Sequence, residues 1–220
     1  MIYYALLLLQ LSTLAYLGHK NMYTLFHAVR RITDSTSVGF WIIALLYFPG
    51  TLVHELSHLF TSVIFMVPPT HINLIPSITE HDNSYSVRLG YVQHVKTDPI
   101  RSCLIGIAPF FVGFLFFFLV NHLELFPHHI WYYNILFFYL FLTISSTMFP
   151  SKQDLKEAYI LILIIMAAIA IIILRDIPVV DYLLTDRAIE IVKRLNIYLV
   201  LGTGANCLMH IFLKLITRSK

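Results

Sequence analysis

The chain has 220 residues, of which 58% are hydrophobic and only 12% are charged, and its formal net charge is +3. Charged residues make up roughly a quarter of an ordinary soluble domain, so this composition argues against a water-soluble globule. The positive charges are spread thinly and form no polybasic tract, which argues against nucleic acid as a partner. We therefore expect an integral membrane protein of the cell membrane, with the lipid bilayer around it.

Six apolar runs approach the roughly 20 residues that a helix needs to cross a bilayer. They are residues 2–17, 40–67, 103–120, 131–149, 158–174 and about 195–216. We expect an all-α polytopic membrane protein with about six transmembrane helices, forming a single integral membrane domain over residues 1–220. The second run is longer than the hydrocarbon core, so it should tilt, kink or break, most simply at Pro49-Gly50. Residues 19–37 mix apolar with polar and basic side chains, which predicts a short interfacial helix.

Residues 70–95 follow a different pattern. Apolar and polar side chains alternate in residues 70–75 and 85–95, on either side of a turn-rich stretch. This alternation predicts a small β-hairpin or sheet inserted after the second apolar run.

His54, Glu55 and His58 form an H-E-x-x-H motif inside the second apolar run. Histidines four residues apart lie on one face of a helix, so both imidazoles can bind one metal ion. Glu55 can accept a proton from a zinc-activated water without being a ligand. An ionised or strongly polar side chain deep in a membrane costs about 2.5–3.5 kcal/mol, which favours a shared ion over a cluster of packed polar side chains. The motif predicts one zinc ion, with Glu55 as the general base.

Catalytic zinc needs a third protein ligand, and Asp154 is the best candidate. It follows Pro150 at the junction of the fourth and fifth apolar runs. Ser151 and Asp154 also have capping-box spacing, so the aspartate could cap the next helix instead. The sequence leaves both roles open.

These features resemble the site-2 protease family of intramembrane zinc metalloproteases, over about residues 40–160. The resemblance rests on the H-E-x-x-H motif, on the segment Gly106-Ile107-Ala108-Pro109 after the β-rich stretch, and on Asp154 after a proline. Leu155 stands where the family usually has glycine, Ala108 replaces a glycine, and a PDZ-sized insertion is absent from the sequence, as in a divergent, minimal member. The resemblance implies hydrolysis of peptide bonds in transmembrane or membrane-associated protein or peptide substrates.

Substrate contacts are expected at two places. A strand edge near the metal can bind an extended peptide by β-augmentation, and residues 71–75, through Ile72 and Leu74, or residues 87–92 could supply it. Alternatively, this hairpin only covers the membrane face. Asn206 and His210, four residues apart in the last apolar run, could line the substrate cavity or form hydrogen bonds between helices.

Two other functions are compatible with the sequence. Eleven histidines make a di-metal membrane oxygenase arithmetically possible, although only His128-His129 offers a second close pair. A non-catalytic membrane transporter or scaffold could use the polar helix for packing or ion passage. The presence of Glu55 between the histidines favours an active enzyme.

Overall fold

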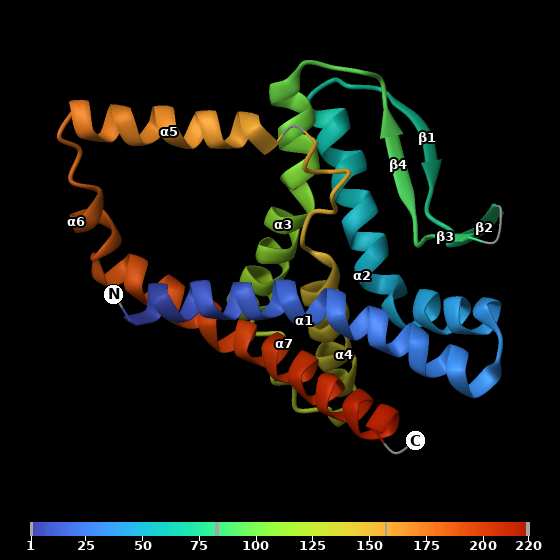
Figure 1. Cartoon of the computed structure of the whole chain (residues 1–220). Helices are drawn as coiled ribbons and strands as arrows, with labels where there is room; N and C mark the ends of the chain where they lie inside the picture. The colour runs from blue at the N-terminus through green and yellow to red at the C-terminus, as the bar shows by residue number, and fades with distance from the viewer. Residues whose placement is uncertain (1, 82–83, 157, 219–220) are drawn as a thin grey trace.

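The computed structural model describes residues 2–81, 84–156 and 158–218. These residues form seven helices and four strands (Figure 1). The helices are α1 (Ile2–Thr33), α2 (Thr36–Ile64), α3 (Pro99–His122), α4 (Trp131–Thr147), α5 (Ala158–Leu174), α6 (Val179–Leu183) and α7 (Asp186–Arg218). The strands, which all lie between α2 and α3, are β1 (Pro69–Asn73), β2 (Ser77–His81), β3 (Ser84–Arg88) and β4 (Tyr91–His94).

All six apolar runs form helices, but the expected count of six crossings is not confirmed. Among the described residues, α1, α2, α3 and α7 are the four helices long and apolar enough to cross a membrane. Helices α4 and α5 have 17 residues each, about 26 Å at 1.5 Å per residue, which is slightly less than the roughly 30 Å hydrocarbon core. The helices support a membrane protein with four candidate spans.

Two helix boundaries differ from the expectation. Helix α1 continues to Thr33, so the residues after position 18 extend the first helix and do not form a separate interfacial one. Helix α2 continues through Pro49, and it changes direction along its length without breaking (Figure 1). A proline inside a helix removes one backbone hydrogen bond and favours such a bend.

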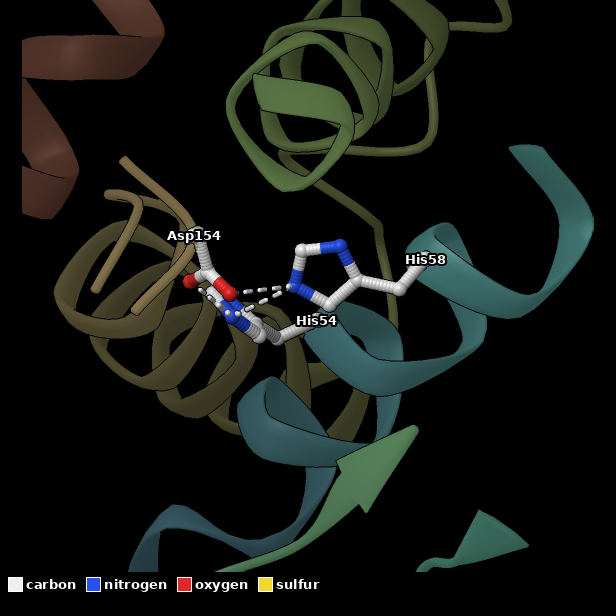
Figure 2. A group of neighbouring side chains, drawn as sticks. All are labelled: His54, His58 and Asp154. Atoms are coloured by element: carbon white, nitrogen blue, oxygen red, sulfur yellow. Dashed lines mark hydrogen bonds and ion pairs between the residues drawn. The ribbon is translucent and has the colours of Figure 1, made fainter. Parts of the chain in front are cut away.

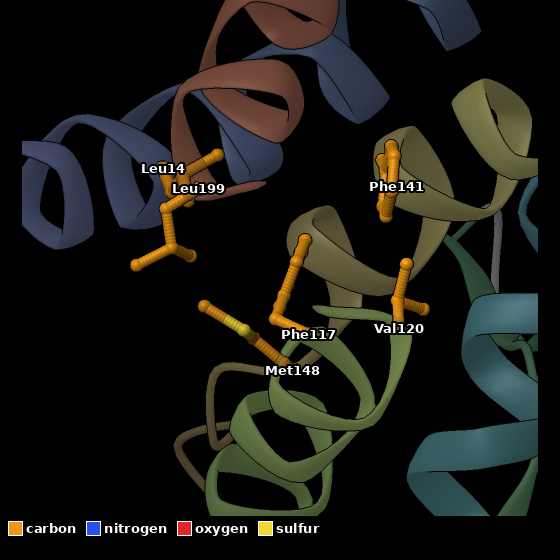
Figure 3. Close-up of a cluster of buried hydrophobic side chains, with 6 residues drawn as sticks. All are labelled: Leu14, Phe117, Val120, Phe141, Met148 and Leu199. Atoms are coloured by element: carbon orange, nitrogen blue, oxygen red, sulfur yellow. The ribbon is translucent and has the colours of Figure 1, made fainter. Parts of the chain in front are cut away.

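The helices form two groups that share a core. Helices α1 and α7 lie side by side, and they run across the group formed by α2, α3 and α4 (Figure 1). A buried hydrophobic cluster joins α1, α3, α4 and α7 (Figure 3), and its members are Leu14, Phe117, Val120, Phe141, Met148 and Leu199. In a membrane such a cluster stabilises helix contacts through close packing, because lipid tails are as apolar as the side chains.

A buried polar network joins α1, α4 and α7. The side-chain amide of Asn21 donates to the backbone carbonyl of Asn206 at 2.8 Å. The Asn206 side chain donates to Ser145 Oγ at 3.1 Å and accepts from Ser146 Oγ at 2.9 Å. His210 Nδ1 donates to Asn21 Oδ1 at 3.0 Å. These bonds fix the C-terminal end of α4 against the α1–α7 pair.

The β insertion is confirmed, as two small antiparallel pairs. Strand β1 pairs with β4, with Ile72 opposite Val92 and Asn73 opposite Tyr91, and β2 pairs with β3. The insertion folds back beside α2 (Figure 1), where β4 contacts that helix. The strand pair therefore lies next to the helix that carries the H-E-x-x-H motif.

Candidate metal centre

Two histidines of α2 and an aspartate from the segment after α4 converge on one point (Figure 2). The Nε2 atoms of His54 and His58 are 3.2 Å apart. Asp154 places Oδ2 at 3.5 Å from His54 Nε2 and Oδ1 at 3.4 Å from His58 Nε2. Two ligands of a tetrahedral ion with bonds of 2.0–2.1 Å are about 3.3 Å apart. The three groups could therefore hold one metal ion.

Backbone carbonyls set the orientation of both imidazoles. His54 Nδ1 donates to the carbonyl of Thr147 at 2.6 Å, and His58 Nδ1 donates to the carbonyl of Ile105 at 2.8 Å. With the proton on Nδ1, each Nε2 has a lone pair, and the two lone pairs face the same point. A hydrogen bond to the second ring nitrogen is typical of metal-binding histidines, because it fixes the tautomer and the ring.

The sequence explains why these two carbonyls are available. In an α-helix the carbonyl of Ile105 would accept the N–H of residue 109, but that residue is Pro109, which has no N–H. Thr147 is the last residue of α4, where carbonyls lack partners within the helix. Each histidine therefore bonds to a backbone carbonyl that has no partner within its own helix, in α4 for Thr147 and in α3 for Ile105.

Asp154 faces the two histidines, and it also forms the hydrogen bonds of a capping box, although these close a turn before α5 and not the helix itself. Its Oδ2 accepts the Ser151 N–H at 2.6 Å, and its own N–H donates to Ser151 Oγ at 3.3 Å, as in a capping box. The resulting turn lies before α5 and directs the carboxylate at the histidines. Burial raises the pKa of Asp154, but hydrogen bonds from the Nε2 atoms of His54 and His58 in their protonated form outweigh this effect and hold the pKa well below its usual value. A bound ion would take the place of those Nε2 protons. The group is therefore a charged oxygen donor.

Gly106 allows the aspartate segment to pack closely against α3. A Cβ atom at this position would overlap the backbone carbonyl oxygen of Asp154. Only a residue without a side chain leaves room for that carbonyl. The position of the third candidate ligand thus depends on a glycine in the segment that carries part of the family resemblance.

We expect Gly106→Ala to weaken metal binding by about 10- to 100-fold, the range found when groups that orient ligands are changed. The added methyl group must displace the backbone of Asp154 and move its carboxylate away from the histidines. Titration of the purified protein with zinc measures the change. Gly204→Ala in α7 is the matched control, because a Cβ atom there meets nothing within 4 Å. Equal losses in the two variants would contradict this role of Gly106.

Glu55 lies beside the three candidate ligands and faces the β insertion. A Cβ atom on Gly90 would lie 2.9 Å from Glu55 Cγ, and Val92 of β4 lines the same cavity as Glu55. Glu55 and the three candidate ligands line one open cavity of about 400 Å³, together with residues 89–93. The carboxylate therefore shares an accessible space with the three candidate ligands.

Of the residues expected to contact substrate, residues 89–92 of the second strand edge line the cavity that contains Glu55, whereas Ile72, Leu74, Asn206 and His210 lie outside it. Ile72 is on β1, 49% exposed, and Leu74 follows that strand. Asn206 and His210 belong to the network between helices. None of the four is among the lining residues of the two cavities that contain His58 and Asp154. Strand β4 lines both cavities, and β1 contributes only Thr70 to one of them. The two strands alternate equally clearly in sequence, so the pattern alone could not choose between them.

The chain matches no protein-family model, no curated protein and no solved structure. Among the described residues, His54, His58 and Asp154 are the one group of three histidine, cysteine or acidic side chains whose ligand atoms lie within 4.8 Å of one another. The chemistry of this group and its cavity is therefore the basis for a functional assignment.

Proposed function

We propose that this protein is a zinc-dependent intramembrane endopeptidase, which hydrolyses peptide bonds of membrane-embedded protein or peptide substrates. The observation that carries the proposal is the convergence of two Nε2 atoms and a carboxylate at 3.2–3.5 Å, with Glu55 lining the same open cavity. The resemblance of the sequence to the site-2 protease family supports the same activity.

The donor set favours zinc. Two imidazole nitrogens and one carboxylate oxygen at tetrahedral separations are typical of a catalytic zinc site that keeps its fourth position for water or substrate. Magnesium and calcium prefer sites made entirely of oxygen ligands. His54, His58 and Asp154 would hold the ion, which supplies Lewis acidity that activates water and polarises a carbonyl.

Glu55 would carry the proton in this reaction. It accepts a proton from the attacking water while the water oxygen bonds to the carbonyl carbon of the substrate. It then delivers that proton to the leaving nitrogen as the C–N bond breaks, so the products are a carboxylic acid and an amine. Strand β4 lines the same cavity as Glu55, which supports a role for this strand in binding an unwound, extended substrate.

Purified protein in detergent should cleave a labelled transmembrane peptide, and its activity should depend on bound metal. We expect one zinc per chain, complete loss of cleavage after chelation and dialysis, and recovery when one equivalent of zinc is returned. Mass spectrometry of the products and elemental analysis of the protein provide the two readouts. Cleavage by fully chelated protein would contradict the metal mechanism, and a zinc-loaded protein that cleaves no tested peptide would favour a scaffold.

A further inference from the structure

Three adjoining cavities lie along residues 89–94, and their sequence in space matches the order of these residues in the chain. Leu89 borders an apolar cavity of about 480 Å³, whose other walls include Met22 and Phe26 of α1. Residues 89–93 border the cavity that contains the metal-binding group. Val92, Gln93 and His94 border a third cavity, of about 290 Å³. These cavities share lining residues, so they form a continuous series.

An extended peptide beside β4 would pass through these cavities in the same order. At roughly 3.3 Å per residue, the five steps from Leu89 to His94 cover about 17 Å. One end of such a peptide would lie among apolar side chains of α1, and its middle would lie at the metal-binding group. Its other end would enter the third cavity, whose walls are mainly polar.

The third cavity is lined by several hydrogen-bond donors and by one lysine side chain. Hydroxyl and amide groups line it, namely those of Thr70, Gln93, Ser102 and Gln153. Lys156 adds a full positive charge. Among the described residues that line it, the carboxylate is that of Asp154, and both oxygens of that group face the histidines. A negatively charged group would find here a charge-assisted hydrogen bond from Lys156 beside neutral donors.

We propose that Lys156 selects substrates that carry a carboxylate two or three residues from the scissile bond, with a large apolar residue on the opposite side of that bond. This inference rests on the proposed peptidase function and defines its substrate class. The carboxylate can come from an acidic side chain or from the end of a peptide chain, because the same ammonium group recognises both. The spacing of two or three residues between carboxylate and scissile bond follows from the separation between the metal-binding group and His94 along β4.

Peptide binding to zinc-loaded Glu55→Gln protein tests this selection without turnover. The probes are fluorescent apolar peptides with an amidated C-terminus, in which one aspartate is moved through the positions around the centre and compared with asparagine. We expect aspartate at one or two adjacent positions, on one side only, to tighten binding about fivefold, as expected for a partly hydrated ion pair. Peptides that end at that position, with a free or an amidated C-terminus, distinguish a chain end from a side chain.

The variant Lys156→Glu should reverse the preference, so that lysine replaces aspartate as the favoured residue at that position. Lys152→Glu is the matched control, because Lys152 is exposed in the same segment and is not among the residues lining the three cavities. Equal zinc content in both variants shows that the fold is intact. The proposal is overturned if Lys156→Glu keeps the aspartate preference, or if Lys152→Glu changes it equally. Selective binding without cleavage by the wild-type protein would contradict only the peptidase function.

Discussion

Replacing His58 by alanine should leave the purified protein without bound zinc. The His58 side chain is buried, with 6% of its surface exposed, and the Ile105 carbonyl orients it. The variant keeps two of three ligands. Changes to groups that merely orient ligands cost about 10- to 100-fold in affinity, so loss of a ligand should cost more than about 100-fold. Elemental analysis after gel filtration measures the retained metal.

His71→Ala provides the control for this experiment. His71 is an exposed residue of β1, and its replacement should leave one zinc per chain. Circular dichroism of both variants checks that the helices are still formed. Stoichiometric zinc in a folded His58→Ala protein would show that the ion is held elsewhere, and the site described above would then have another role.

Glu55→Gln should lower the cleavage rate by about a thousandfold, within the 10²–10⁴ range of general acid–base catalysis. Glutamine has the same shape as glutamate and still accepts hydrogen bonds, but it cannot take the proton of the attacking water. Zinc should stay bound, because Glu55 is not one of the three candidate ligands. The initial rate and the zinc content are to be measured on the same sample.

Glu190→Gln is the control for general effects of removing a carboxylate, since Glu190 lies on α7 and pairs with Arg194 at 2.8 Å. Its activity should equal that of the wild type. Full activity of Glu55→Gln would show that another group activates water. Loss of zinc from Glu55→Gln would show that Glu55 acts as a ligand.

The local part of the site could be predicted from the sequence because helix geometry fixes it. The i, i+4 spacing of His54 and His58 requires both side chains to share a helix face. Asp154 could be proposed only from its position after a proline and from the family resemblance, since neither shows how a distant segment packs against α2. Its approach depends on the close contact at Gly106, which no local sequence pattern predicts.

Other features depend on contacts between distant segments, which local patterns do not determine. The carbonyl that orients His58 is available because of Pro109, but nothing in the sequence pairs that proline with that histidine. The first apolar run ends at residue 17, yet α1 continues through Gly18, where a Cβ atom would come within 2.8 Å of the Ser146 carbonyl oxygen. This glycine allows close packing of α1 against α4.

The candidate ligands come from two segments that are far apart in the chain, so the binding position exists only once α2 and the turn after α4 have come together. An ion that binds only the folded chain adds its binding free energy to stability, by about 2.7 kcal/mol when its concentration is 100 times the Kd. Zinc scarcity would then do more than stop catalysis. It would expose the protein to faster degradation, so its abundance in the cell would follow the metal supply.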